Sequence, residues 1–428
     1  MPNPLLIENA RIIDPATGRD HIGAILVDNG AIADIVEGAA PGAPENAERI
    51  DASGLVACPG LIDMRVFTGE PGTDYRETLE TASLAAAAGG VTSMVVMPDT
   101  APVIDDAALV DFLARRAAAT ARVRVLPSAA ITRGVEGRDI TEFGLLREAG
   151  AVCLTDGRRS IQDAGVMRAA MTYAVNFDTP IVHLPCDASL AAGGQMNAGP
   201  LASFLGLKGI PAEAETIPLD RDLQLALATG ARYHAAQIST ARGAEIVADY
   251  RKRGSAISAG VSINNLCLNE NDIGSYRSYY KVNPPLRHED DRKALIAAIR
   301  SGTIDCIHSD HDPQDTEVKR QPFADAAAGA VGLETLLSAA LRLVHSGDLD
   351  LMTLLATMTV RPADILGLET GRLQKGAPAD ICLFDLDYPW VVEERALRSR
   401  SHNTPFEKAR MMGKTVRTIV AGETVFGG

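Results

Sequence analysis

The chain has 428 residues, 46% of them hydrophobic, and a formal net charge of −14 with a sequence pI near 5.1. The length fits one large barrel or two to three ordinary domains, and the acidic balance argues against nucleic acid or an anionic membrane as the main partner. The six cysteines form no C-x-x-C pair, no secretory signal or apolar membrane-length run is visible, and a cytoplasmic protein with reduced thiols is expected.

The first part of the chain predicts short strands separated by turn signals, among them Asp14-Pro15 and Asp28-Asn29-Gly30. These predicted strands cover residues 5–13, 22–27, 32–36 and 55–57. Strands return at the other end of the chain, over residues 381–384, 414–420 and 423–426. Because head and tail are each too short for a stable sheet, we expect residues 1–58 and 370–428 to form one small β-sandwich together.

Between these ends, apolar strand-like runs alternate with alanine-rich helical segments. Eight such alternations predict an α/β fold, a parallel (β/α)₈ TIM-type barrel over residues 59–369. The predicted strands are 60–66, 91–97, 123–129, 151–154, 180–184, 232–238, 256–262 and 304–309. The predicted helices include 75–88, 107–120, 220–229, 241–253 and 290–300, followed by 332–345 and 349–366.

In such a barrel the chemistry lies where the strands end, so the motifs at those positions carry the functional signal. The first strand opens with Pro59-Gly60-Leu61-Ile62-Asp63 and leads to Glu70-Pro71-Gly72. Other motifs follow in order, at residues 89–92, 193–197, 281–287, 302–305, 309–311, 332–335 and 403–406. Together they resemble the dihydroorotase family of the amidohydrolase superfamily. The resemblance implies a hydrolase of a cyclic amide in pyrimidine biosynthesis, with a binuclear zinc site.

Four positions where the resemblance implies zinc-binding histidines carry other residues. On strand one they are Arg65 and Phe67, after strand five Leu184, and after strand six Gln237. A guanidinium has no lone pair to offer a cation, and a phenyl ring is no ligand. Neighbouring histidines do not replace them. His183 lies one residue early, which turns it to the opposite strand face, and His234 is the non-ligand member of its motif; both are expected to be structural.

Two carboxylates of the implied metal site remain. Asp310 follows strand eight and matches the family's catalytic aspartate. Asp156 matches the strand-four region, although that segment is one residue short, and an aspartate on a strand-end loop is ordinarily a turn or helix cap. Carboxylates without imidazoles hold zinc poorly, so no cofactor is expected; zinc would be the metal if the chain is active after all.

The substrate contacts implied by the resemblance are altered as well. Gly69 stands where the family has a carboxylate-binding arginine, Asp99 and Ala101 stand for two asparagines, and Asp99 would repel an anion. Asn283 and Arg287 remain as vestigial substrate-binding residues.

Three functions follow. The resemblance extends to non-catalytic dihydroorotase-like chains, which implies a homo-oligomeric partner of the aspartate carbamoyltransferase catalytic subunit. The second is an active amidohydrolase with a non-standard or mononuclear metal site built on His308, His311, Asp310 and His183. The third is a protein that binds a small anion near Arg65 without chemistry.

Arg65 itself predicts a specific contact. A carboxylate at Asp310 that has lost its metal would be left uncompensated in a partly buried pocket, and a guanidinium can neutralise it by hydrogen bonding. We therefore expect Arg65 to form an ion pair with Asp310, the alternative being an arginine solvated at the barrel mouth. Phe67 is expected to fill the space of the missing imidazole and metal.

Overall fold

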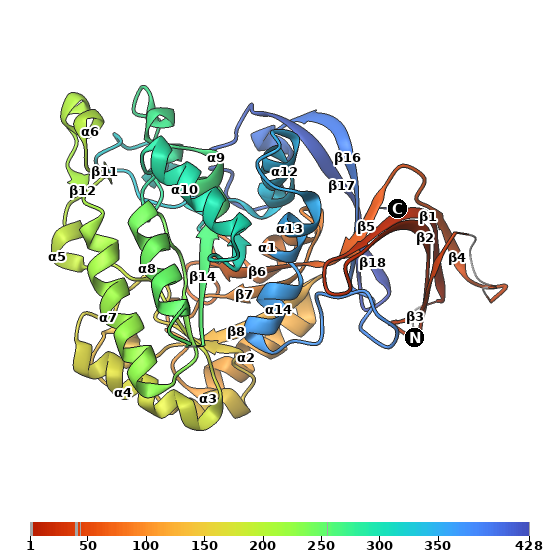
Figure 1. Ribbon diagram of the computed structural model, residues 1–428, viewed down its shortest axis with the longest axis horizontal. Coiled ribbons are helices and arrows are strands. Elements are labelled where there is room, and N and C mark those ends of the chain that lie inside the picture. Colours follow the sequence, from red (N-terminus) through yellow and green to blue (C-terminus); the bar gives the residue numbers. More distant parts are fainter. Residues whose placement is uncertain (1–2, 39–41, 43, 255, 428) are drawn as a thin grey trace.

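The computed structural model describes residues 3–38, 42, 44–254 and 256–427. A barrel surrounded by helices lies beside a separate sheet, and both ends of the chain lie in that sheet (Figure 1). The predicted α/β architecture is therefore confirmed.

Eight parallel strands form the barrel and follow one another in chain order. They are β6 (Leu61–Val66), β7 (Val91–Val96), β8 (Arg124–Ala129), β9 (Cys153–Leu154), β10 (Ile181–His183), β13 (Tyr233–Ala235), β14 (Ile257–Ser262) and β15 (Cys306–His308). A parallel bridge between Val66 and His311 joins the first strand to the last. Apolar side chains from opposite strands, including Ile62, Val182 and Cys306, form one buried cluster inside.

Helices cover the outside of the barrel (Figure 1). The main ones are α1 (Leu79–Ala88), α2 (Ala107–Thr120), α3 (Phe143–Glu148), α4 (Ala164–Ala174), α7 (Glu213–Thr229), α8 (Ala241–Arg251), α10 (Glu289–Arg300), α12 (Leu336–His345), α13 (Leu351–Ala356) and α14 (Val360–Leu366). Short pieces complete the layer: α5 (Ala188–Ala191), α6 (Pro200–Leu205), α9 (Ile263–Cys267), α11 (Thr316–Lys319), β11 (Met196–Asn197) and β12 (Gly209–Ile210).

Two helix boundaries differ from the prediction for local reasons. α1 begins at Leu79 and not at residue 75, because Thr78 is extended and its side chain accepts the Thr81 amide as a cap. The helix predicted over 349–366 is two helices, since Thr359 between them has non-helical angles of φ −132° and ψ −92°.

The second sheet combines strands from both ends of the chain. It contains β1 (Leu5–Asp14), β2 (Arg19–Asp28), β3 (Ala31–Glu37), β4 (Glu48–Asp51), β5 (Val56–Pro59), β16 (Ile381–Val391), β17 (Arg410–Val420) and β18 (Glu423–Phe426). The order is β18-β17-β16-β5-β1-β2-β3, with β4 paired to β1, so the strands expected to form a sandwich belong to one hydrogen-bonded sheet. The two ends of the chain meet where Cys382 pairs with Cys58.

Contacts between sheet and barrel are specific. Arg124 on β8 forms an ion pair with the buried Asp380, with Nε 2.9 Å from Oδ2, and the same carboxylate accepts the Ala421 amide. The β16–β17 hairpin is longer than predicted and lies along α12, where Ser338 Oγ donates to Gly413 O at 2.7 Å. In the part of the chain that the structure describes, no helix is long and apolar enough to cross a membrane.

Candidate functional site

The end of strand β6 is irregular, and this irregularity positions Arg65. Between Asp63 and Val66 the strand spends one residue more than its partner β7, which is a bulge. The buried Asp63 carboxylate supports it, since Oδ1 accepts the Arg65 amide at 3.0 Å and Oδ2 accepts the Ser309 amide at 3.1 Å. A bulge re-aims a side chain, and here the Arg65 guanidinium points at Asp310.

Asp310 is held by two of the residues that replace the expected histidines. Arg65 Nε lies 3.2 Å from its Oδ1, and Gln237 Nε2 donates to its Oδ2 at 3.2 Å. Arg65 also donates through Nη1 to Gly157 O at 3.3 Å. Arg65 and Asp310 are only 5% and 7% exposed, so the expected ion pair is present and buried, and the alternative of a solvated arginine is wrong.

Burial raises the pKa of Asp310 to about 6, and the positive charge of Arg65 limits the rise. The residue also has φ 53°, a left-handed conformation that is uncommon outside glycine. Asp310 therefore combines an unusual backbone with a perturbed carboxyl, a combination typical of functional sites.

Phe67 is 2% exposed and packs against two guanidinium groups. Arg158 Cζ is 4.1 Å and Arg76 Cζ is 4.3 Å from the centre of its ring. The ring therefore fills the mouth, as expected of a residue in place of an imidazole, and it adds cation–π contacts to two arginines that the sequence analysis did not single out.

Arg158 and Arg76 also form ion pairs around the mouth. Arg158 Nε lies 2.6 Å from Asp99 Oδ2, and Arg158 Nη1 lies 3.2 Å from Asp312 Oδ1. Arg76 Nη2 reaches the same oxygen of Asp312 at 2.5 Å. Asp99 was expected to repel an anion, but its charge is neutralised by Arg158. The sequence signal that could have predicted this contact is Asp99 itself, since an acidic residue buried after a strand needs a nearby cation.

The cavity at the mouth is small. Its volume is about 30 Å³, and its lining consists of Arg65, Phe67, Met97, Arg158, Asn283, Asp310, His311, Asp312 and Gly329. This is room for a water molecule or two, whereas sites for organic ligands commonly exceed about 300 Å³. The arginines and Phe67 therefore leave no room at the mouth for a ring-shaped organic ligand.

Asp156 is bound to the neighbouring loop, and it makes no hydrogen bond to Arg65 among the residues that the structure describes. Its Oδ1 accepts the amides of Ile131 and Thr132 at 2.9 and 3.0 Å, and its Oδ2 accepts Thr132 Oγ1 at 2.5 Å. These contacts match the turn-bracing role left open for it. Leu184 is 1% exposed and packs as an apolar side chain.

His183 and His234 are satisfied by hydrogen bonds away from Asp310. His183 Nδ1 lies 2.7 Å from Asp222 Oδ2, and its Nε2 accepts the Ile161 amide at 2.9 Å. His234 Nδ1 lies 2.8 Å from Ser258 Oγ, and burial lowers its pKa to about 3. Both are structural, as expected.

His308 and His311 flank Asp310 in sequence but contact other groups. His308 Nε2 donates to Ala236 O at 3.1 Å, and burial, helped by the charge of Arg65, lowers its pKa well below the usual value. His311 Nδ1 accepts the Gly332 amide at 3.2 Å, while its Nε2 lies 3.4 Å from the buried Glu77 carboxylate.

The two residues assigned to substrate binding lie apart. Asn283 is exposed and lines the mouth cavity. Arg287 is buried and is not part of that lining, since its guanidinium donates to Ser239 Oγ, Asn197 Oδ1 and Ile210 O at 3.0, 3.0 and 2.8 Å. Its contacts are those of a framework residue.

The residues at the mouth do not fit the zinc pair that the family resemblance implies. Zinc needs lone pairs, yet Arg65 and Gln237 both direct N–H groups at Asp310, and Phe67 offers no ligand atom. Over the described ranges, no group of three or more His, Cys, Asp or Glu side chains has a geometry that could hold a metal ion.

Comparisons with known proteins agree with the architecture. Residues 54–243 match a model described as dihydro-orotase-like, and residues 231–426 match one for an amidohydrolase family. The chain is 41% identical to a dihydroorotase of Pelobacter propionicus over 99% of both chains. It is 38% identical to one of Anaeromyxobacter dehalogenans over 99% of this chain and 98% of that one.

Solved structures share the fold. An L-hydantoinase (dihydropyrimidinase) from Arthrobacter aurescens superposes with a TM-score of 0.90 at 25% identity, covering 100% of this chain and 96% of the other. A dihydropyrimidinase from Brevibacillus agri reaches a TM-score of 0.86 at 20% identity over 99% and 95% of the two chains, which supports the fold alone.

Proposed function

Because the chain belongs to the dihydroorotase family of the amidohydrolase superfamily, we propose that it is a member without zinc chemistry that serves as a structural partner of aspartate carbamoyltransferase. One observation carries the first half of this proposal. At two positions where a ligand would have to offer a lone pair, Arg65 and Gln237 instead donate hydrogen bonds to Asp310.

The physical argument is that metal and guanidinium compete for the same carboxylate. A dication placed beside Asp310 would lie next to the permanent positive charge of Arg65, which cannot be deprotonated in a protein. The ion pair supplies the countercharge that a buried carboxylate needs, so the fold gains nothing further from a metal.

The partner is proposed from the resemblance to non-catalytic dihydroorotase-like chains, together with a scaffold that is retained around an altered site. On the same ground we propose a cytoplasmic homo-oligomer that binds the catalytic subunit of the carbamoyltransferase. Retaining a complete barrel while its metal ligands are replaced is expected of a protein whose surface, and not its pocket, is in use.

The test is a metal analysis of chain purified without chelators, a dihydroorotate hydrolysis assay, and co-elution with the aspartate carbamoyltransferase catalytic chain of the same organism. The proposal expects zinc far below one per chain, no turnover, and a joint peak in gel filtration. Stoichiometric zinc with turnover would overturn its first half, and separate elution of the two chains at micromolar concentration would overturn the second.

An active amidohydrolase is the second candidate, favoured by relatives at 38–41% identity over the full chain that are named dihydroorotase. In that case Asp310, whose pKa of about 6 suits proton transfer, would be the catalytic residue. Turnover that is present in the wild type and disappears in Asp310→Asn, while circular dichroism shows the variant to be folded at the assay temperature, would favour this candidate.

A further inference from the structure

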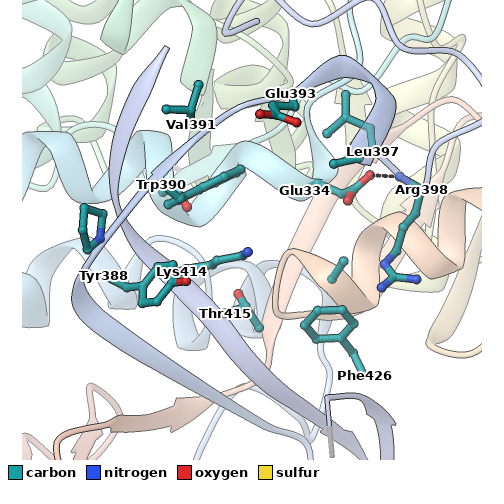
Figure 2. A pocket seen from close by; sticks show the side chains of 14 residues that line it. Glu334, Tyr388, Trp390, Val391, Glu393, Leu397, Arg398, Lys414, Thr415 and Phe426 are labelled. Carbon is teal, nitrogen blue, oxygen red and sulfur yellow. Dashed lines mark hydrogen bonds between the residues drawn. The ribbon is translucent and has the colours of Figure 1, made fainter. Parts of the chain in front are cut away.

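A second and larger cavity lies away from the barrel mouth. It occupies about 400 Å³ between the β16–β17 hairpin, the start of α12 and the end of β18 (Figure 2). None of its lining residues lines the mouth cavity. Its volume falls in the range of sites that bind small organic molecules.

Aromatic rings form much of its wall. Trp390, Tyr388 and Phe426 all line the cavity, and the indole of Trp390 is fixed because Nε1 donates to Gly413 O at 3.0 Å. Flat, rigid side chains of this kind bind planar rings, including nucleobases, by stacking.

Two cationic side chains, Lys414 and Arg398, lie close to these aromatic rings. Lys414 Nζ is 5.3 Å from the centre of the Trp390 ring and 5.6 Å from that of Tyr388, and Arg398 Cζ is 5.1 Å from that of Phe426. Within the described chain neither cation has a carboxylate within ion-pair distance, although Glu393 also belongs to the lining. Figure 2 shows the Lys414 side chain reaching into the open space. Unpaired ammonium and guanidinium groups are suited to an anionic group of a ligand.

An acceptor lies on the other side of the cavity. Glu334 is held by the backbone, because its Oε1 accepts the amides of Arg398 and Ser399, the latter at 3.3 Å. Its other oxygen, Oε2, has no hydrogen-bond partner among the residues that the structure describes, and the carboxylate faces the cavity (Figure 2). Burial raises the pKa of Glu334 to about 7, so the carboxyl ionises, and becomes an acceptor only, as the pH rises through neutrality.

We propose that this cavity is a binding site for a mononucleotide. The base would lie against the aromatic wall, an N–H group of the base would donate to Glu334, and the phosphate would bind Lys414 and Arg398. A planar ring with a hydrogen-bond donor and a nearby dianion meets all three features, whereas a bare anion uses only the cations and an uncharged ring leaves them unpaired. The site is independent of the function proposed above.

The chain carries its own reporter for this site, since Trp390 is its single tryptophan and lines the cavity. The experiment titrates the full chain with AMP, GMP, CMP and UMP while its fluorescence is recorded, with ribose 5-phosphate and inorganic phosphate as ligands that lack the base. At least one mononucleotide should give a saturable change at an affinity at least tenfold above either control ligand. No response to any of the four at 10 mM, or equal affinity for ribose 5-phosphate, would overturn the proposal.

Variants locate the response. Lys414→Ala and Arg398→Ala should each weaken mononucleotide binding by about tenfold, as expected for loss of a charge-assisted phosphate contact. Matched controls are Lys375→Ala and Arg395→Ala, which are exposed and outside the lining. Equal affinities of all four variants, checked to be folded by circular dichroism, would contradict the assignment.

The acceptor has a separate signature. Glu334→Gln keeps an oxygen for the two backbone amides but cannot gain charge. In the wild type, binding should tighten as the pH rises from 6 to 8 and Glu334 ionises. Ionisation of the phosphate contributes the same trend to both proteins, so the difference between them isolates Glu334. Identical pH profiles would remove Glu334 from the site and overturn the proposed base contact.

Discussion

At the scale of single residues, the barrel mouth shows how one charge can stand where a metal would be. Asp310 is buried and would be costly to leave alone, and Arg65 supplies a permanent cation at 3.2 Å. Desolvating two charges offsets much of their attraction, so such a pair adds little net stability. Removing one partner is different, since it leaves the other as an uncompensated buried charge.

We therefore predict that Arg65→Met lowers the free energy of unfolding by about 3–5 kcal/mol at pH 8, measured by urea denaturation. The effect should depend on pH. Folding raises the pKa of Asp310 from 3.8 to about 6. The free-energy cost of ionising this carboxyl in the folded state is therefore absent below pH 3.8, grows as the pH rises to about 6, and is complete above it. Because Arg65 restrains that rise, its loss should matter less at pH 4.5, where the carboxyl can be protonated.

Two further variants test whether an uncompensated buried charge causes the loss of stability. The double variant Arg65→Met with Asp310→Asn should recover most of the loss at pH 8, since no buried charge remains. Arg11→Met is the matched control: Arg11 pairs with Asp20 at 2.8 Å on the surface, where loss of a pair changes stability by about 1 kcal/mol or less. A pH-independent loss that the double variant does not recover would refute the buried-charge explanation.

At the scale of elements, the ends of the barrel strands are fixed by buried carboxylates that serve the backbone. Asp63 joins the bulge of β6 to the residue after β15, and Asp156, after β9, braces the loop that follows β8. Both aspartates therefore act as structural acceptors, and for Asp156 the family resemblance had also suggested a metal-site carboxylate.

The role of Asp156 as a hydrogen-bond acceptor predicts different losses of stability for two substitutions. Asp156→Ala removes the acceptors of two amides and one hydroxyl and should destabilise the fold by about 2–4 kcal/mol. Asp156→Asn keeps an oxygen for the amides and should lose less than half as much. Thermal denaturation with hydrogen exchange at Ile131 and Thr132 measures this, and equal losses in the two variants would show that the charge itself is needed.

At the scale of the whole molecule, the barrel mouth and the cavity beside the β16–β17 hairpin differ in how much open space they contain. The barrel mouth is filled by Phe67 and the arginines packed against it. The junction of the β16–β17 hairpin with α12 contains a cavity of about 400 Å³ (Figure 2). That cavity lies between the barrel layer and the C-terminal strands of the composite sheet, since Ala88, Glu334 and Ser338 line it together with residues of the hairpin and β18.

Restoring histidine at positions 65, 67, 184 and 237 together tests whether the assembled scaffold is otherwise competent. We predict that the fourfold variant binds zinc, measured by metal analysis after dialysis, but does not hydrolyse dihydroorotate. Gly69 and Asp99 leave the substrate's anchors missing, and Arg158 with Asp312 still occupies the mouth. Turnover in that variant would show that Gly69 and Asp99 do not prevent substrate binding, and absence of zinc would show that the four strand ends do not converge on a metal site.

The sequence by itself determined the barrel and the assembly of both ends of the chain in one sheet. The alternation of apolar runs and the order of the motifs are local features of the chain, so they can be recognised without the folded structure. The pairing of Arg65 with Asp310 also followed from the sequence, because a buried carboxylate requires a countercharge.

Only the tertiary structure decided the rest. Arg76 and Arg158 come from different strand-end loops and both contact the ring of Phe67, and Asp156 turns to its neighbouring loop instead of to Arg65. Glu334 and Lys414 face one cavity although 80 positions separate them. Such contacts depend on which side chains the closed barrel and the returning hairpin bring together. The number of residues between two loops does not say how far apart they lie in space, so these contacts could be identified only in the folded structure.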